Sequence, residues 1–586
     1  MFLSIQNYKK NIQSTLLKDA LYLCFLSFLV LAFLIINSDT SNTFFLNSFN
    51  CILLLFFINI AVYETWLKLL SNIKSPQPAF RIARISLTPI LILLLLLPYH
   101  YFYNQMDNWQ QLTCLSSICL GIRMLYKILT EAQPKLISSY KLLFIASSLY
   151  AIFFSVLSVT RYLNYQSVNT QDIGLYNQIQ WNNLHGHFFE SSTSGSNFVT
   201  HNSPFLILLT PFYAICPYPQ GLLALKTFFL AFSSFPFFLI TRHFLDERPA
   251  LLLSLGYLFF PFIVGQNFSA PHEIIFLPPI LLFCFYFFIK NKFKEFLIFL
   301  LLSLSIKEHL ALVSIMFGFY ALLLKKRKRW IYVPIVLGIA WALLSIWIMH
   351  YAQKIYSVDP APAWLIEEIK RNFVHSNASV LINLINGFKS TNLGQWHNFY
   401  FIYLILSPLI IVFPFFSIIW LLGLPELLIN LLAAHPLTYP TWHYSIVISC
   451  FLLISCAATI KKLSTKLHQK SAIFPLYKIQ MLLACFLLIC ILSHFFLWSD
   501  NLIIKDNPLY TQTMNEVVLL IPPAASVSLP KNLAGYFSNR RNYFLLGDSR
   551  KGEYLIIDNA EDDSHPNQFK EIFNRNGIKV YKQIQP

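Results

Sequence analysis

Charge and glycine are scarce in this sequence. Of its 586 residues only 12% are Asp, Glu, Lys or Arg, and only 16 are glycine. The sequence contains no glycine-rich phosphate-binding loop, no HExxH helix motif, no GxSxG motif and no CxxC pair. Each of these motifs places the groups that its chemistry requires, so their absence argues against nucleotide-driven transport and against a metalloprotease.

Cysteine and positive charge are present but not clustered. The ten cysteines, among them Cys24, Cys284 and Cys485, lie mostly inside apolar runs and lack metal-ligand spacing. We therefore expect small buried side chains rather than disulfides or zinc sites. The net charge of +17 is spread over short loops between apolar runs. A nucleic-acid partner needs basic residues gathered on one polar surface, so we expect no nucleic acid to bind.

Long apolar stretches are abundant. Hydrophobic residues make up 56% of the chain, and the mean hydropathy is +0.57. Many stretches approach the roughly 20 apolar residues that cross a bilayer. No small-residue cleavage site follows the first stretch, near residues 20–37, so we expect the N-terminus to stay attached. The sequence predicts an α-helical polytopic membrane protein with roughly 13 to 15 spans.

The loops indicate an orientation, because Lys and Arg accumulate on the cytoplasmic side of a membrane. The N-terminus carries Lys9, Lys10 and Lys18, and the strongest basic cluster, KKRKR, covers Lys325–Arg329. We expect both of these segments to be cytoplasmic. Counting outward from them places the segment that contains Asp172 on the opposite, outer face.

The same count divides the chain into three parts. We expect a four-span N-terminal extension over 1–140 and a transmembrane core over 141–498, whose outer loops are 161–203 and 350–397. From residue 499 to 586 the composition becomes polar, with short apolar runs that suit strands. We predict a small extracytoplasmic α/β domain there, and within it a helix over Gln568–Asn576 that Gly577 would cap.

Two short apolar segments in the core do not suit complete spans. Pro204–Cys216 is short and rich in proline, so we expect a re-entrant or interfacial segment. The arms 295–306 and 310–324 flank the polar triplet Lys307–His309 and end at the basic cluster. The triplet is therefore expected to face outward at a break between two helical arms.

Ionisable residues collect at the outer ends of the predicted spans and in the polar segment that follows Arg161. Burying a charge near hydrocarbon costs at least about 2.5 kcal/mol, so such residues usually face a partner or a wet cavity. We expect them to converge on one site. The candidates are Arg161, Asp172, Gln178, His201, His272, Glu273, Lys307, Glu308, His309 and His443.

Structural explanations stay open for several of these candidates. Asp172 precedes an apolar-periodic run and suits a helix N-cap. His272 with Glu273 suits an interfacial dipole, and Lys307 with Glu308 suits an intramembrane ion pair. His201 and His443, each taken alone, suit structural roles. One outer-face carboxylate surrounded by cationic side chains nevertheless fits a phosphorylated lipid.

Several runs of the sequence resemble a family of uncharacterised bacterial predicted membrane proteins. They include DIGLYNQIQWNNLHGHFFESS from Asp172 onward, PHEIIFLPPI, SIKEHLAL, LPELLINLLAAHPLTYPTWHY and IPPAASVSLPKNLAGYFSNRRNYFLLG. The resemblance extends from about Leu142 to the C-terminus. Its organisation is similar to that of GT-C-type glycosyltransferases, which take a sugar from a polyprenyl-phosphate donor and hold the catalytic acid in the outer loop after the first conserved span. Asp172 lies at that position.

The resemblance implies a GT-C-like core that transfers sugar to a lipid or envelope acceptor, with Asp172 as general base. Lys307, His272, His309 and Arg161 are then candidates to stabilise the leaving phosphate, and the other residues to bind substrate. No cofactor is required, although a divalent metal could bridge Asp172 and the phosphate. Two alternatives stay open: a carrier or flippase for an anionic lipid, and a sensor or scaffold whose function lies in the tail.

Overall fold

The computed structural model describes residues 138–356 apart from 168, 397–432, 443–470, 475–494 and most of 502–584. The N-terminal extension, most of the second outer loop and His435 lie outside the described residues. Two compact units divide the chain: Ala132–Lys461 with Leu497–Pro586, and Met1–Glu131 with Lys462–Phe496. The fold and the site below belong to the first unit; the described part of the second is the helix α22 (Leu476–Ser493) with the end of α21.

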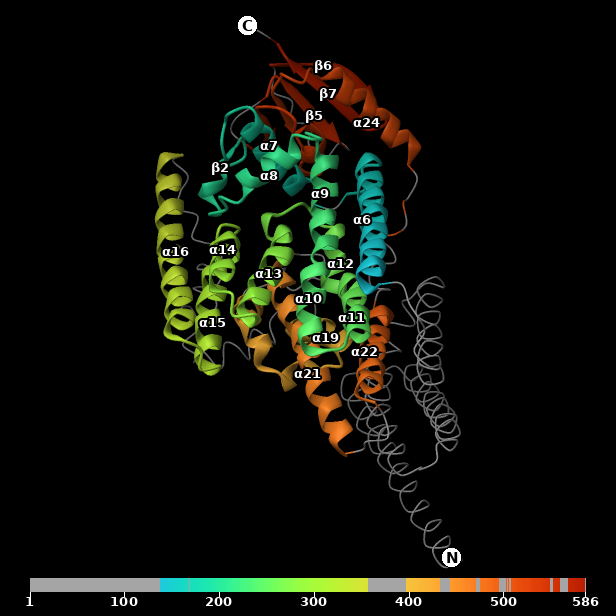
Figure 1. The fold of residues 1–586 in the computed structure, drawn as a ribbon. Helices are drawn as coiled ribbons and strands as arrows, with labels where there is room; N and C mark the ends of the chain where they lie inside the picture. The colour runs from blue at the N-terminus through green and yellow to red at the C-terminus, as the bar shows by residue number, and fades with distance from the viewer. Residues whose placement is uncertain are drawn as a thin grey trace, which may run out of the picture. The chain divides into compact units, whose positions relative to one another are not determined.

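The first unit is mostly helical (Figure 1). Its helices are α6 (Ser139–Leu163), α7 (Thr170–Leu184), α8 (Leu206–Tyr213), α9 (Pro219–Phe232), α10 (Ser234–Phe244), α11 (Glu247–Phe259), α12 (Pro261–Val264), α13 (Leu277–Ile289), α14 (Phe293–Leu304), α15 (Leu310–Leu323), α16 (Lys328–Ile355), α19 (His397–Leu406), α20 (Leu424–Leu432), α21 (Ile446–Lys470) and α24 (Pro508–Leu520).

Within the described residues, four helices are long and apolar enough to cross a membrane. They are Ser139–Leu163, Pro219–Phe244, Lys328–Ile355 and His443–Gln469. A fifth candidate joins α11 to Pro261–Asn267 across a bend of 50°. Pro261 explains the bend, because its ring cannot continue the preceding helix and it begins a new one instead.

The two short segments adopt the forms that their sequences favour. Within Pro204–Cys216 the helix α8 has only eight residues and contains Pro211, so it is too short to cross a bilayer. The triplet Lys307–His309 separates α14 from α15, and α15 packs along α16. Both α14 and α15 are shorter than a span, as expected of arms that meet at a polar break.

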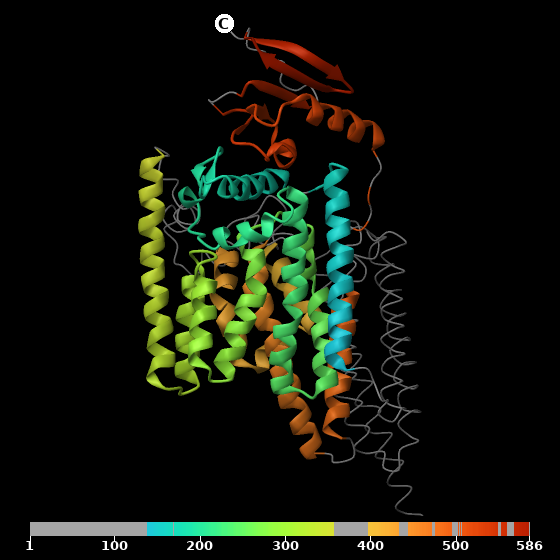
Figure 2. The ribbon, with the colours of Figure 1, turned by 45° about the horizontal axis from the view of Figure 1, so that its top comes forward.

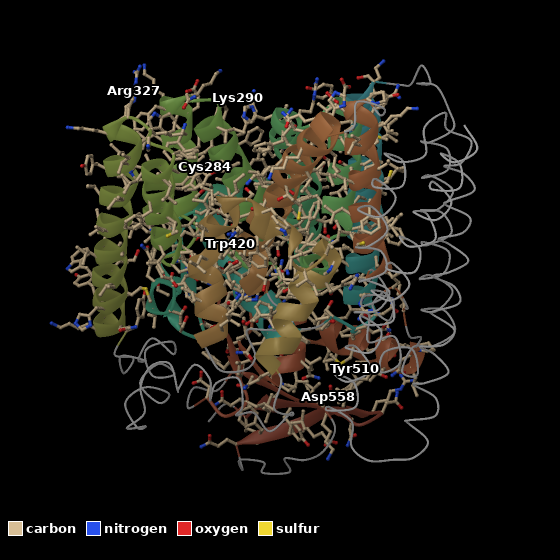
Figure 3. The ribbon with its side chains drawn as sticks, turned by 90° about the horizontal axis from the view of Figure 1, so that it is seen from below. Cys284, Lys290, Arg327, Trp420, Tyr510 and Asp558 are labelled. Atoms are coloured by element: carbon tan, nitrogen blue, oxygen red, sulfur yellow. The ribbon has the colours of Figure 1, made fainter. Side chains whose placement is uncertain are left out.

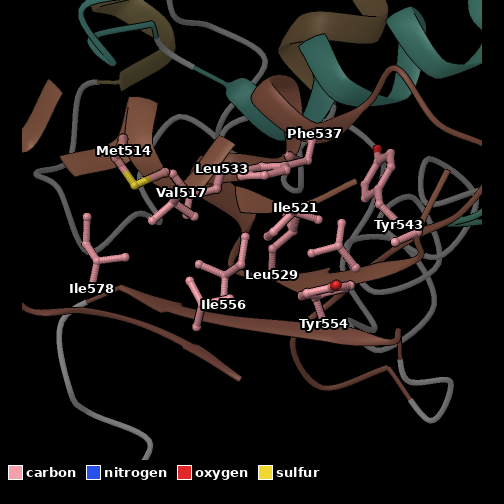
Figure 4. Packing of buried hydrophobic residues seen from close by; sticks show 14 residues of the cluster. Met514, Val517, Ile521, Leu529, Leu533, Phe537, Tyr543, Tyr554, Ile556 and Ile578 are labelled. Carbon is pink, nitrogen blue, oxygen red and sulfur yellow. The ribbon is translucent and has the colours of Figure 1, made fainter. Parts of the chain in front are cut away.

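The tail forms a five-stranded sheet beside α24. Its strand order is β4 (Tyr543–Leu545), β3 (Val527–Leu529), β5 (Tyr554–Asp558), β7 (Ile578–Gln583) and β6 (Phe569–Arg575). Strand β3 is parallel to both β4 and β5, whereas β7 is antiparallel to β5 and β6. Apolar side chains of α24 and the strands pack into one core, including Met514, Val517 and Ile556 (Figure 4).

The helix expected over Gln568–Asn576 is wrong, because this segment contains strand β6 and closes a hairpin with β7. The turn consists of Asn576 and Gly577, whose φ angles are 52° and 82°. Asn-Gly accepts positive φ at both positions, and that geometry matches the twist of a two-residue hairpin. The glycine that resembled a helix cap is therefore a turn residue.

The segment predicted to be the first outer loop contains α7 and lies between the bundle and the tail. Figure 2 shows α7 lying crosswise to the helices of the bundle, at the end that faces the sheet. The short strands β1 (Glu190–Ser191) and β2 (Gly195–Ser196) and the 3-10 turn η1 (Asn197–Val199) follow it. In Figure 3, Lys290 and Arg327 lie at one end of the helices and Tyr510 and Asp558 at the other.

Candidate active site

Asp172 lies in the first turn of α7. The residue at the N-cap is Asn169, with φ of 55°, so the alternative that Asp172 caps the helix is wrong. The backbone amide of Asp172 donates to the Asn169 carbonyl over 3.1 Å, which completes that turn. This position lies at the positive end of the helix dipole, where acidic side chains are common.

Two histidines lie beside this carboxylate. His272 Nε2 is 3.4 Å from Asp172 Oδ2, and the ring of His443 stacks on that of His272 with centroids 3.8 Å apart. The side chain of Asp172 is 31% exposed, whereas His272 is 9% exposed. His443 is buried, and neither of its ring nitrogens has a hydrogen-bond partner. The carboxylate thus reaches solvent while the imidazoles behind it do not.

Tyr176 extends this group by one turn of α7. Its hydroxyl lies 3.3 Å from Nδ1 of His272 and also lies close to the carboxyl group of Glu273. The position is four residues after Asp172, so both side chains point to the same side of the helix. Tyr176 therefore joins the Asp172–His272 pair to the buried ion pair described next.

Lys307 and Glu273 form that ion pair. Lys307 Nζ lies 2.7 Å from Glu273 Oε1, and the two side chains are 5% and 0% exposed. Glu273 begins the 3-10 turn η3 (Glu273–Phe276), and Lys307 comes from the break between α14 and α15. Burying either charge alone would cost several kcal/mol, roughly, so each requires the other.

Glu308 has a different partner from Lys307, so the expected Lys307–Glu308 pair is wrong. Its Oε1 lies 3.0 Å from His201 Nδ1, and its Oε2 accepts the backbone amide of Asn202 over 3.2 Å. Side chains of consecutive residues in a turn point in different directions. Lys307 and Glu308 therefore form ion pairs with different partners. Burial raises the pKa of Glu308, but His201, Lys307 and His309 together outweigh it and hold this pKa at about 2.

His309 is the third residue of the triplet. Burial, with Lys307 nearby, lowers its pKa to about 4, although the Glu308 carboxylate acts in the opposite direction. A histidine with so low a pKa is neutral at physiological pH and can offer a hydrogen bond but no full charge.

Eight of the ten candidate side chains thus lie in one electrostatically coupled cluster at the end of the bundle that faces the tail. They are Asp172, His201, His272, Glu273, Lys307, Glu308, His309 and His443.

The other two candidates make their contacts elsewhere. Gln178 points to the opposite side of α7, where its Nε2 donates to the carbonyls of Arg540 and Arg541 over 3.2 and 3.0 Å. Arg161, near the end of α6, donates to the Gln166 carbonyl over 3.2 Å. Gln178 therefore binds the tail domain.

Two residues of this region, Tyr176 and Lys226, were not among the candidates from the sequence. Tyr176 carries no charge, but its spacing of four from Asp172 was a usable signal. Lys226 lies fully buried within α9 and donates to the carbonyl of Ser269, in the loop that leads to His272. A lone lysine in the apolar run LLALKTFFL was the signal, because such a position is costly without a partner.

The site combines a proton acceptor with imidazoles that can donate to an anion. Over the part of the chain that the structure describes, no group of three His, Cys, Asp or Glu side chains is arranged to hold a metal ion. The chemistry that these residues can supply by themselves is proton abstraction at Asp172 and hydrogen bonding to negative charge.

Comparison with solved structures gives distant matches. ArnT from Cupriavidus metallidurans, bound to undecaprenyl phosphate, is 8% identical, with a TM-score of 0.45; the match covers 76% of this chain and 98% of that one. The Archaeoglobus fulgidus oligosaccharyltransferase in its apo form is 12% identical, with a TM-score of 0.33 and coverage of 72% and 70%.

A third match is the archaeal oligosaccharyltransferase AglB from Archaeoglobus fulgidus with an inhibitory peptide and a dolichol-phosphate. It is 12% identical, with a TM-score of 0.28 and coverage of 67% and 63%. Among curated proteins, none matches this chain. The model of the family "Predicted membrane protein (DUF2079)" matches residues 163–583. The match includes the site and the tail, and the chain therefore belongs to the DUF2079 family of predicted membrane proteins.

Proposed function

We propose that this protein is a GT-C-like glycosyltransferase that moves a sugar from a polyprenyl-phosphate donor to a lipid or envelope acceptor. One observation carries the proposal: a partly exposed carboxylate, Asp172, faces a buried group of imidazoles and one lysine. That arrangement pairs a base with groups that attract a phosphate, and such a transfer requires both.

Asp172 acts as the general base. It takes the proton of the acceptor hydroxyl while that oxygen attacks the anomeric carbon. The bond from this carbon to the phosphate oxygen breaks, and polyprenyl phosphate leaves with the bonding electrons. One carboxylate suffices, because a phosphate leaves as an anion and needs no general acid.

The other acids of the cluster are engaged elsewhere. Glu273 is fully buried and pairs with Lys307. Both oxygens of Glu308 are held, one by His201 and one by the Asn202 amide. Among the acids of the cluster, Asp172 is therefore the one that is both exposed enough to meet a hydroxyl group and placed to take its proton.

The imidazoles stabilise the leaving phosphate. His272 is nearest to the base and becomes cationic when it gains a proton, and His443 has two ring nitrogens without protein partners. His309 contributes as a neutral donor. Lys307 already shares its charge with Glu273, so its contribution to phosphate binding is smaller than that of an unpaired lysine.

The reaction takes place on the outer face of the bacterial inner membrane. The basic residues Lys290 and Arg327 lie at the end of the helices opposite to the tail (Figure 3). Basic loops are cytoplasmic by the charge rule, which supports an outer position for the tail and for Asp172.

The test compares Asp172→Asn with Asp172→Glu and Glu190→Gln in a strain that lacks the protein. Glu190 lies in the same loop and pairs with Arg541, so it is a matched acid outside the cluster. Mass spectrometry of envelope lipids and glycans measures the product that disappears on deletion. We expect Glu190→Gln to restore it and Asp172→Asn to reduce it by about 10²- to 10⁴-fold, the usual contribution of a general base.

Equal protein in the membrane fraction is the control for all three variants. Full restoration by Asp172→Asn would exclude Asp172 as the base. A second outcome of the deletion would indicate a flippase instead. In that case the sugar content of the product is unchanged, and the lipid carrier accumulates on one side of the membrane.

A further inference from the structure

The helix that carries the base has two distinct faces. Successive residues of an α-helix are rotated by about 100° around the helix axis. The mean direction of Asp172 and Tyr176 therefore differs by about 160° from the mean direction of the residues on the other side. Those residues are Thr170, Gly174, Asn177 and Gln178. The first face belongs to the candidate active site. The second face, here called the amide face, is built around two side-chain amides.

The amide face contacts one stretch of the tail, residues 531–543, here called the docking segment. Asn177 Nδ2 donates to Ser538 Oγ over 2.8 Å and to Asn539 Oδ1 over 2.6 Å. The Gln178 amide holds the carbonyls of the next two residues of the segment. About two turns earlier on α7, Thr170 Oγ1 donates to the carbonyl of Lys531 over 3.1 Å.

The backbones of the two segments also approach closely. A Cβ atom at Gly174 would lie 2.8 Å from the backbone carbon and oxygen of Ala534. Only glycine permits this approach, since ordinary carbon contacts are near 3.5–4.0 Å. Gly174 therefore allows the docking segment to lie directly on α7.

Residues around α7 hold the same segment. Tyr162 donates to the Gly535 carbonyl over 3.0 Å, and its ring stacks on Tyr536 with centroids 4.6 Å apart. Ser192, beyond the end of α7, donates to the Tyr543 carbonyl over 2.5 Å. The contact thus extends over the whole docking segment and not over one point of it.

We infer that the docking segment fixes the position of α7, so that Asn177 and Gln178 are positioning residues for Asp172, if Asp172 is the base as proposed above. Each neutral hydrogen bond contributes about 0.5–1.5 kcal/mol, and a buried amide that loses its partners costs about 1–3 kcal/mol. A shift of about 1 Å at a base can cost about 10²-fold in rate. The docking segment then affects the reaction through the position of α7.

The most direct test adds a methyl group at the contact between α7 and the docking segment. Gly174→Ala places a methyl group against the backbone of Ala534, although alanine by itself favours a helix by about 1 kcal/mol over glycine. If this substitution lowers the transfer rate or the protection from hydrogen exchange, the cause is therefore the disturbed contact and not weaker helix formation. The full-length protein is measured by hydrogen exchange over residues 170–184 and by the rate of sugar transfer.

We expect Gly174→Ala to accelerate exchange over 170–184 by about tenfold and to lower kcat by about 10- to 100-fold with little change in KM. Gly535→Ala is the graded variant, because its nearest contacts, Ile173 Cγ2 and the Thr170 carbonyl, are 3.3 Å away; we expect a smaller change in both measurements. Gln512→Ala, on α24 outside the docking segment, should change neither.

If Gly174→Ala does not accumulate, Asn177→Ala alone, Asn539→Ala alone and both together supply the same test, because coupling between them reports the direct contact. Unchanged exchange over 170–184, or faster exchange with an unchanged rate, would overturn the inference. A wild type without transferase activity would refute the proposed function instead, and the exchange measurement would still decide whether the docking segment holds α7.

Discussion

The two faces of α7 differ in how completely their polar groups are bonded. On the amide face, both donors and the acceptor of Asn177 have partners, the latter through the Tyr213 hydroxyl over 2.8 Å. Gln178 likewise donates twice, and its oxygen accepts the backbone amide of Ser192 over 2.9 Å. On the site face, His272 Nε2 has only the 3.4 Å approach of Asp172, and both nitrogens of His443 are unpartnered.

This difference indicates that the two faces have different roles, one in support and one in chemistry. Buried polar groups are nearly always hydrogen-bonded, so a complete set indicates a rigid scaffold. Buried groups without partners are costly unless a ligand or water satisfies them. The amide face therefore holds the helix in place, whereas the site face leaves nitrogens of His272 and His443 without hydrogen-bond partners, and under the proposed function these would bind a phosphate or hydroxyl group.

The largest effect among the neighbours of Asp172 is expected at the ion pair beneath the site face. Lys307→Met leaves Glu273 buried without its counter-charge, and breaking such a pair costs about 3–5 kcal/mol. We expect a loss of folded protein, measured as thermal stability in detergent. The double variant Lys307→Met with Glu273→Gln should recover most of it, because no charge is then left unpaired.

That recovery would assign Lys307 a structural role beneath the site face. If the double variant is stable and still lacks transferase activity, the pair also serves the reaction. A single Lys307→Met variant as stable as wild type would contradict the buried ion pair.

A smaller effect is expected at Tyr176, which connects the two pairs of the site face. Tyr176→Phe removes the hydroxyl that lies 3.3 Å from His272 Nδ1 and keeps the ring. We expect about a tenfold loss in kcat, about what one hydrogen bond of roughly 1–1.5 kcal/mol supplies, with KM nearly constant.

The pH profile of kcat distinguishes positioning from packing at Tyr176. Loss of the hydroxyl changes the hydrogen bonding of His272 and should move the profile, whereas lost packing would lower the rate equally at every pH. A uniform decrease would therefore contradict the connection between the two pairs.

The smallest effect is expected at the rim of the amide face. Arg541 pairs with Glu190 over 2.8 Å, but their side chains are 42% and 36% exposed. Exposed pairs contribute about 0–1 kcal/mol and weaken in salt. We expect Arg541→Ala to leave thermal stability and transfer rate nearly unchanged, in contrast to Gly174→Ala; a large loss would show that the rim, and not the amides, holds the tail.

Several local features could be predicted from residue types alone. The polar triplet between two short apolar arms predicted the break between α14 and α15. The short segment Pro204–Cys216 predicted a helix too short to span a membrane. The resemblance to a family of bacterial membrane proteins is confirmed by the match over 163–583. The hairpin at Asn576 was missed because a glycine after a polar run also suits a helix end.

Pairings could not be predicted in the same way. An ion pair of Lys307 with Glu308, its neighbour in the chain, was one open alternative, yet Lys307 pairs with Glu273. Gln178 was a candidate for substrate binding, and nothing in the sequence indicated that it contacts the tail more than 360 positions away. In both cases the direction of a side chain, set by its turn or helix, decided between partners of similar chemistry.

Hydrophobicity and charge depend only on the composition and order of residues, so they were predictable: the chain is apolar enough for a membrane, and few polar residues interrupt it. Which of these residues share a surface depends on the fold. Helix α7 shows the reason: residues 172 and 174 are near neighbours in sequence, but the helical twist turns one toward His272 and the other toward Ala534.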